Sequence, residues 1–156
     1  MRFNDLDLLN RNILKKIKNS TEKIFKRNNF IFGDEVFELE EKLANTIKSN
    51  YCISVGSGTD ALLICLLSLK LKKNDEVLIP SFSWLSVIEV VLLIGAKPVF
   101  IETDKNTFNL NVKCIEKKIN KNTKAIVSTS LFGRTVDLIE INKICKKNKI
   151  THIEDA

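Results

Sequence analysis

The spacing of apolar residues changes repeatedly along the chain, between the period of an amphipathic helix and the short continuous runs of a buried strand. Helical spacing, with three or four residues between apolar positions, predicts helices over residues 6–24, 34–47, 59–69, 83–94, 111–119 and 137–147. Short β-branched and apolar runs predict strands at residues 51–55, 76–80, 98–101, 124–128 and 150–154. Gly95 stands where the helix over residues 83–94 should end, since glycine is the usual residue just past a helix.

Strands that alternate with helices over connections of this length form parallel βαβ units. We therefore predict an α/β fold, with a parallel-rich sheet and flanking helices. With 156 residues and 44% hydrophobic residues, the chain is large and apolar enough to bury a core. Neither an internal repeat nor a low-complexity linker interrupts the pattern.

The composition narrows the possible partners and compartments. The net charge is +6, but lysines are spread throughout the chain and form no stripe with aromatic residues, so we expect no nucleic acid. The apolar run over residues 87–94 is interrupted by Glu89 and is too short to cross a bilayer. The four cysteines show neither a CxxC pair nor metal-ligand spacing. These features predict a cytoplasmic protein with reduced thiols and no metal site.

A glycine-rich turn between a predicted strand and a predicted helix is the strongest candidate for chemistry. Residues 55–61 read Val-Gly-Ser-Gly-Thr-Asp-Ala, and a helix N-terminus after such a turn presents unpaired N–H groups and a partial positive charge. Phosphate is the anion most often held in this way. The turn alone is equally compatible with a plain βα connection whose glycines serve only the backbone geometry.

A dinucleotide site is a second interpretation of this turn, because residues 56–61 fit the G-x-G-x-x-A fingerprint. That fingerprint also requires an acidic residue at the end of the next strand, to bind the ribose hydroxyls. The next predicted strand instead runs into Pro80 and Ser81, while Asp75 and Glu76 lie at its opposite end. The sequence therefore disfavours a nicotinamide or flavin dinucleotide.

Short motifs in a fixed order resemble the DegT-type (DegT/DnrJ/StrS) family of nucleotide-sugar aminotransferases. The matching segments are residues 33–36, 57–62, 75–77, 80–84, 95–100, 123–126, 131–133 and 153–156, together with Glu40. The family consists of fold-type I enzymes that use pyridoxal 5′-phosphate (PLP). The resemblance implies an N-terminal helical segment at residues 1–32, followed by the N-terminal part of the large domain at residues 33–156. The rest of that domain and the small C-terminal domain would be absent.

The resemblance assigns the phosphate group of PLP to the glycine-rich turn. The backbone N–H groups of Gly58, Thr59 and Asp60 would bind the phosphate, and the hydroxyl group of Ser57 or Thr59 would add a hydrogen bond. This assignment agrees with the anion site that the turn itself suggests.

Two further residues are assigned to the cofactor ring by the resemblance. Trp84 matches the aromatic residue that stacks on the pyridine ring, although a core tryptophan is the alternative. Asp155 matches the aspartate that pairs with the pyridine nitrogen and keeps it protonated. His152, the only histidine, is interpreted as structural because it should face the opposite side of the sheet from Asp155. Ser86 is a weaker candidate for a cofactor contact.

The chain departs from the family pattern in three respects. Glu102 stands where Asp is frequent, and Arg134 stands where Gln is common, which puts loop contacts in doubt. The lysine that forms the Schiff base in the family lies beyond the pyridine aspartate, and this chain ends at Ala156. We therefore assign no catalytic residue, and we expect that the 156-residue polypeptide cannot transaminate alone.

The resemblance implies an enzyme that moves an amino group from an amino acid, commonly glutamate, to a nucleotide-linked keto-sugar. A homodimer and a role in polysaccharide precursor synthesis are also implied. A PLP-dependent sugar dehydratase of the same family is an open alternative, because the residue that separates the two activities lies outside the chain. A truncated, noncatalytic fragment that binds a partner subunit is another.

Overall fold

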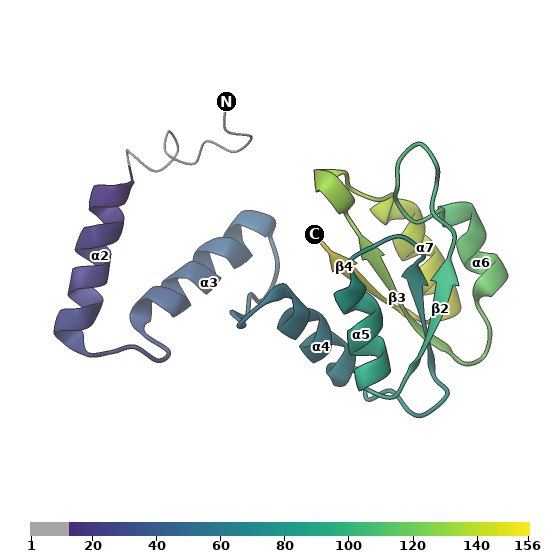
Figure 1. Ribbon diagram of the computed structural model, residues 1–156, viewed down its shortest axis with the longest axis horizontal. Helices are drawn as coiled ribbons and strands as arrows, with labels where there is room; N and C mark the ends of the chain where they lie inside the picture. The colour runs from purple at the N-terminus through teal and green to yellow at the C-terminus, as the bar shows by residue number, and fades with distance from the viewer. Residues whose placement is uncertain (1–12) are drawn as a thin grey trace. The chain divides into compact units, whose positions relative to one another are not determined.

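The computed structural model describes residues 13–156, and the chain divides after Ser54 into two compact units (Figure 1). The first unit contains helices α2 (Leu14–Arg27) and α3 (Asp34–Ile47). Residues 6–12 of the first predicted helix lie outside the described residues, and helix α2 extends past the predicted end at residue 24. Helix α3 begins with two acidic residues, Asp34 and Glu35, which favourably complement the positive end of the helix dipole.

Residues 51–55 form no strand, so this prediction was wrong. The segment has a strand-like composition, but Tyr51 is 81% exposed and Ile53 is 75% exposed. A strand requires a hydrogen-bonded neighbour, and residues 51–54 instead make polar contacts within their own unit. The N–H of Tyr51 donates to the hydroxyl of Ser49, and the N–H of Ser54 donates to the Glu40 carboxylate at 2.6 Å.

The second unit is a four-stranded sheet flanked by helices on both faces. Its elements, in chain order, are α4 (Gly58–Ser68), β1 (Glu76–Pro80), α5 (Leu85–Leu93), β2 (Lys97–Ile101), η1 (Val112–Cys114), α6 (Ile115–Lys118), β3 (Thr123–Thr129), η2 (Leu131–Gly133), α7 (Leu138–Asn148) and β4 (Thr151–Asp155). The strand order is β2-β1-β3-β4, and every neighbouring pair is parallel. The predicted α/β class with a parallel sheet is therefore confirmed.

Each face of the sheet has its own core. Helices α4 and α5 cover one face, where Leu66 and Val91 are fully buried with Val77, Ile79 and Val127 of the strands. Helices α6 and α7 cover the other face, where the core is built from Leu78, Ile101, Ile115, Ile126 and Ile141. Strands β1 and β3 are thus buried on both faces, which explains why they read as continuous apolar runs.

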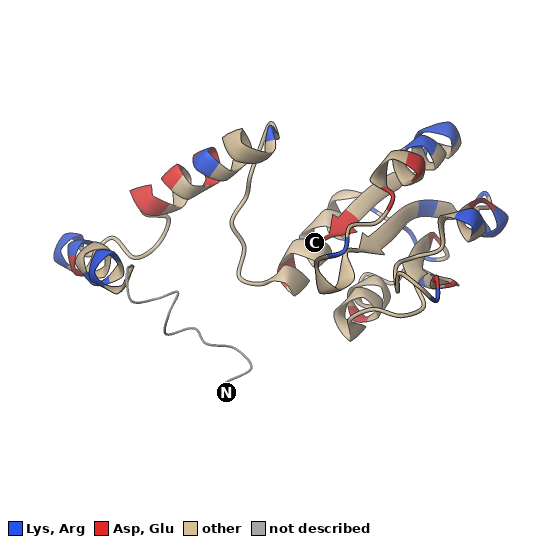
Figure 2. Ribbon diagram, turned by 90° about the horizontal axis from the view of Figure 1, so that it is seen from above, with Lys and Arg blue, Asp and Glu red and all other residues tan. Residues whose placement is uncertain are grey.

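Charged side chains are dispersed over the helices and loops. Figure 2 shows basic and acidic residues on several separate elements of the described chain, without a continuous basic stripe. Within residues 13–156, no helix is long and apolar enough to cross a membrane. The same residues contain no cluster of His, Cys, Asp and Glu side chains that could hold a metal ion.

Candidate cofactor site

The N-terminus of helix α4 is closed by a reciprocal contact between Ser57 and Asp60. The Ser57 hydroxyl accepts a hydrogen bond from the Asp60 N–H at 3.1 Å and donates one to the Asp60 carboxylate at 2.9 Å. The carboxylate also lies close to Gly56, where an added Cβ atom would be 2.8 Å from Asp60 Oδ2. Ser57 therefore caps the helix, and a side chain at position 56 would collide with that arrangement.

The backbone N–H groups of Gly58 and Thr59, the first two residues of α4, are free to bind a ligand. Among the described residues, no acceptor receives the N–H of Gly58 or Thr59, whereas the Asp60 N–H is already used by Ser57. A Cβ atom at Gly58 would have no heavy atom within 4 Å, so the space beside these amides is open. Two unpaired N–H groups, the helix dipole and an open approach suit a phosphate group.

A cavity of about 470 Å³ joins this helix terminus to two other elements. Gly58 and Thr59 line it from α4, Trp84 lies at the start of α5, and Asp155 lies at the end of β4. Leu62, Leu85 and Ser86 complete the lining, which includes neither Ser57 nor Asp60. The fold thus brings four of the six predicted cofactor residues together from segments far apart in the sequence. The volume falls within the range of small-molecule sites, roughly 300–1,000 Å³.

Trp84 presents its ring at the surface of the cavity rather than in the core. It is the N-cap residue of α5 in extended backbone conformation, and its side chain is 70% exposed. The preceding residue is anchored, because the Ser83 hydroxyl donates to Thr129 Oγ1 at 2.9 Å. The alternative of a core tryptophan is therefore not supported, and Trp84 is held where a flat ligand can lie against it.

Asp155 is placed by the register of the sheet. It pairs with Thr129 of β3, and its backbone carbonyl accepts from the Ser130 N–H at 2.8 Å. Burial raises the pKa of the Asp155 carboxyl above its ordinary value, because desolvation disfavours the charged form. A protonated ring nitrogen beside this carboxylate would oppose that shift, since an opposite charge favours ionisation.

His152 lies on the other face of the sheet, against α7. Its Nδ1 atom is 2.8 Å from Asn142 Oδ1, and its Nε2 atom is 2.7 Å from the Ser128 hydroxyl. Because the amide oxygen can only accept, Nδ1 carries the proton and Nε2 accepts from Ser128. Burial lowers the pKa of His152, so the imidazole is neutral at pH 7. These contacts agree with the structural interpretation of His152.

Several features of the cavity were not predicted from the sequence. The contact between Ser83 and Thr129 joins residues 46 positions apart, and no local pattern indicates it. Leu62 and Leu85 lie in the segments predicted as helices, and neither was predicted to line the cavity. No lysine of the described chain lines it, so a covalent anchor for a carbonyl ligand is not part of this lining.

Comparison with known proteins gives the class to which this fold and cavity belong. The model of the DegT/DnrJ/EryC1/StrS aminotransferase family matches residues 11–156. The chain therefore belongs to that family, as its motifs suggest.

Among curated relatives, the chain is 40% identical to UDP-2-acetamido-2-deoxy-3-oxo-D-glucuronate aminotransferase of Pseudomonas aeruginosa. The alignment covers 100% of this chain and 44% of the relative, so the chain spans less than half of that protein's length.

Solved structures show the same fold. A DegT/DnrJ/EryC1/StrS aminotransferase from Brucella abortus has a TM-score of 0.94 at 32% identity, over 100% of this chain and 44% of that one. NtdA from Bacillus subtilis, with bound cofactor PMP, has a TM-score of 0.93 at 30% identity, over 100% and 36%. GDP-4-keto-6-deoxy-D-mannose-3-dehydratase from Escherichia coli, with bound hydrated PLP, has a TM-score of 0.83 at 29% identity, over 89% and 37%.

Proposed function

We propose that the cavity between α4, α5 and β4 binds PLP or its amine form, pyridoxamine 5′-phosphate (PMP). The Gly58 and Thr59 amides take the phosphate, Trp84 lies against the ring, and Asp155 pairs with the ring nitrogen. The observation that carries the proposal is the meeting of these groups in one cavity of about 470 Å³. The cofactor-bound structures of NtdA and of the Escherichia coli dehydratase support the choice of cofactor.

Ser57 and Asp60 support the same phosphate site without contacting the phosphate. Their reciprocal hydrogen bonds hold the turn, and they leave the two preceding helical amides unpaired for the phosphate. The Asp60 carboxylate is turned back toward Gly56, where it would lie 2.8 Å from an added Cβ atom. Ser57 and Asp60 therefore fix the conformation of the turn, and the backbone N–H groups of Gly58 and Thr59 bind the phosphate.

Asp155 has the chemical role of holding a proton on the ring nitrogen. When bound, PLP acts as an electron sink for the carbon from which a proton is removed. The ionised Asp155 carboxylate favours the protonated ring nitrogen, because an opposite charge nearby stabilises the protonated form.

We infer that the whole protein transfers an amino group from an amino acid, such as glutamate, to a nucleotide-linked keto-sugar. Membership of the family and the similarity to the Pseudomonas aeruginosa aminotransferase support this inference. Because no lysine of the described chain lines the cavity, the Schiff-base lysine would come from outside residues 13–156. The chain of 156 residues is accordingly expected to lack transaminase activity by itself.

We place the protein in the cytoplasm, as part of a homodimer. All four cysteines are free, which is usual in a reducing compartment.

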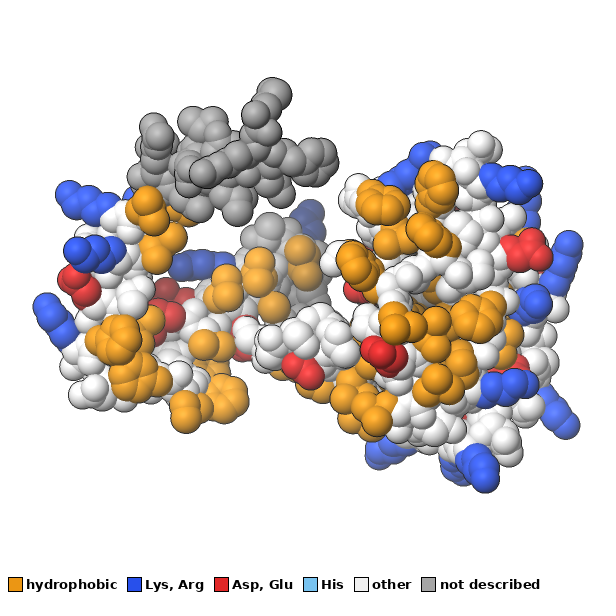
Figure 3. All heavy atoms as spheres, viewed as in Figure 1, with side chains coloured by type: hydrophobic (Ala, Val, Ile, Leu, Met, Phe, Trp, Pro, Cys, Tyr) orange, Lys and Arg blue, Asp and Glu red, His pale blue; other side chains and the backbone are white. Residues whose placement is uncertain are grey.

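Exposed apolar residues support the homodimer. Figure 3 shows exposed apolar side chains gathered over the second unit. Near the cavity, Phe82, Trp84, Leu85 and Phe132 are all more than half exposed, and a second copy is the occupant that we propose for this surface.

A sugar dehydratase is the second candidate, favoured by the similarity to the Escherichia coli enzyme at a TM-score of 0.83. Both activities would use the proposed PLP site, so the product of the reaction distinguishes them. Assay of the whole protein with a nucleotide-linked keto-sugar and glutamate separates them. An aminated sugar is expected, whereas a deoxygenated product would replace the aminotransferase proposal with the dehydratase.

The cofactor proposal can be tested on the 156-residue chain, because Trp84 is its only tryptophan. PMP is the suitable probe, since it carries no aldehyde and cannot couple to surface lysines. Saturable quenching of Trp84 fluorescence by PMP is expected, with much weaker binding of pyridoxamine, which lacks the phosphate. Asp155→Asn should weaken PMP binding by about tenfold or more, through loss of a charge-assisted hydrogen bond.

The matched control is Asp34→Asn, an exposed change in the first unit. Circular dichroism of each variant verifies that the fold is retained. If PMP leaves Trp84 fluorescence unchanged in a folded protein, or if both variants bind PMP like the wild type, the assignment of the cavity is wrong.

A further inference from the structure

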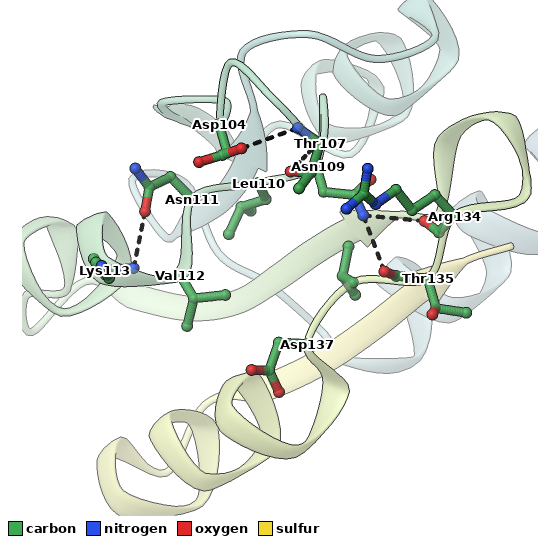
Figure 4. A pocket seen from close by; sticks show the side chains of 11 residues that line it. Asp104, Thr107, Asn109, Leu110, Asn111, Val112, Lys113, Arg134, Thr135 and Asp137 are labelled. Carbon is green, nitrogen blue, oxygen red and sulfur yellow. Dashed lines mark hydrogen bonds between the residues drawn. The ribbon is translucent and has the colours of Figure 1, made fainter.

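Asn109 joins the loop after β2 to the loop after β3, at the edge of the sheet where the parallel strands end. Its side chain reaches across to Arg134 and Thr135 (Figure 4), and Nδ2 donates to both backbone carbonyls at 3.0 Å. The backbone carbonyl of Asn109 accepts from the Asp104 N–H at 2.9 Å, which fixes the residue within its own loop. Asn109 is only 6% exposed, so it is a buried bridge between the two loops.

On one side of this bridge, contacts of the loop after β2 lead to the segment that carries Trp84. The ring of Phe108, the residue before the bridge, lies 6.0 Å from the ring of Phe82, measured between centroids. The hydroxyl oxygens of Ser81 and Thr103 are 3.2 Å apart. The two residues that precede the Ser83–Trp84 pair are therefore held against the loop after β2.

On the other side, the loop after β3 leads to Asp155. The loop begins at Ser130, whose N–H donates to the Asp155 carbonyl at 2.8 Å, and it ends at the two carbonyls that Asn109 holds. Trp84 and Asp155 thus lie at the two ends of one series of contacts, with Asn109 between them. We call this series, formed by residues 81–84, 103–109, 130–135 and Asp155, the loop network.

Three energetically unfavourable features lie in the loop network. Phe108 has a φ of 59° and Phe132 a φ of 56°, in the left-handed region that bulky residues rarely occupy. Asn109 Oδ1 is buried without a hydrogen-bond partner among the described residues, although buried amide oxygens are nearly always paired. Such costs persist where the surroundings fix the conformation, and they are concentrated at functional sites. These features indicate that the network serves a site and not stability alone.

We propose that Asn109 is a positioning residue for the cofactor site, because it sets the distance between Trp84 and Asp155. These are the two residues that we assign to the ring of PLP or PMP, so the inference rests on the function proposed above. The phosphate contacts lie outside the network, since Gly58 and Thr59 belong to α4. Loss of the Asn109 bridge should therefore weaken the ring contacts and leave the phosphate contacts unchanged.

The experiment compares PMP with inorganic phosphate, which has no ring and occupies only the phosphate part of the site. NMR shifts of the Gly58 and Thr59 amides in the isotope-labelled 156-residue chain give the Kd for both ligands. In Asn109→Ala, the Kd for PMP should rise by about tenfold or more, the effect of losing one hydrogen bond to a charged group. The Kd for phosphate should not change. When Asp155 is already replaced by asparagine, Asn109→Ala should have a smaller effect on PMP, because one of the ring contacts that it positions is gone.

Asn120→Ala is the matched control. Asn120 Nδ2 donates to the Glu76 carboxylate at 2.7 Å, at the opposite edge of the sheet, so its loss should lower stability and leave both Kd values unchanged. Phe108→Gly interrupts the loop network at a different contact. Glycine suits the φ of 59° at this exposed position, so this variant should keep its fold and should also raise the Kd for PMP.

Circular dichroism and urea unfolding verify the fold of each variant, and Phe108→Gly decides the matter if Asn109→Ala does not fold. The inference is overturned if the folded variants bind PMP as tightly as the wild type, or if the Kd for phosphate rises by the same factor. A different result, no binding of PMP by the wild type, would refute the cofactor assignment itself.

Discussion

Substitution of Gly58 by alanine should separate the stability of the protein from its affinity for the cofactor. Gly58 is the first residue of α4, its φ is not in the left-handed region, and an added Cβ atom would have no heavy atom within 4 Å. Alanine fits this backbone and restricts the unfolded chain, so the free energy of unfolding should rise by about 0.4–1 kcal/mol.

The same methyl group would stand beside the two amides that we assign to the phosphate. Loss of one charge-assisted hydrogen bond costs about 1.5–3 kcal/mol, so the Kd for PMP should rise by roughly tenfold to a hundredfold. Gly95→Ala is the opposite case. Gly95 has φ of 78° and lies at the far end of α5 from the cavity, so alanine should lower stability by about 1–2 kcal/mol and leave PMP binding unchanged.

Two measurements on each variant decide the matter. Urea unfolding followed by circular dichroism gives the free energy of unfolding, and quenching of Trp84 fluorescence gives the Kd for PMP. The reasoning is refuted if Gly58→Ala binds PMP as tightly as the wild type. It is equally refuted if this variant is clearly less stable, because the space beside the helix terminus would then not be open.

Three further outcomes follow from the packing and the buried polar groups. Leu66→Ala should lower the free energy of unfolding by about 2–5 kcal/mol, and Leu67→Ala, at a half-exposed neighbour, by much less in the same urea titration. The hydrogen bond from Asn120, with Lys97, lowers the pKa of buried Glu76 below 4.5. The stabilisation that ionised Glu76 provides is therefore fully present above pH 4.5 and is lost as the pH falls through its lower pKa in the folded state. In Glu76→Gln, the free energy of unfolding should change less with pH over this range. Burial lowers the pKa of His152 below 6.5, so stability should fall from pH 7.5 to 5.5, and His152→Gln should remove that part of the slope.

The layered α/β fold could be predicted from the sequence because helices and buried parallel strands differ in the spacing of their apolar residues. Strands β1 and β3 are buried on both faces, and this produces the continuous apolar runs from which they were predicted. The same logic failed at residues 51–55. Their composition is that of a strand, but a strand also depends on a neighbour, and local sequence carries no information about that neighbour.

The candidate site was predictable only where a motif marks it. The positions of Gly58, Trp84 and Asp155 came from the family resemblance, and the structure places all three in one cavity. Whether each of them binds the cofactor stays a prediction. The closure between Ser57 and Asp60, and the unsatisfied oxygen of Asn109, depend on side-chain conformations that spacing does not encode.

The parallel pairing of β3 with β4 makes the end of the chain intolerant of single-residue insertions and deletions. His152 faces α7 and Asp155 faces the cavity because successive side chains of a strand point to opposite sides. One residue gained or lost near the start of β4 would exchange the two faces, so that Asp155 would point toward the side of α7 and His152 and Glu154 toward the side of the cavity. Natural length variation in this protein should therefore collect in the loops and be absent from β4, even where individual amino acids in the strand are free to change.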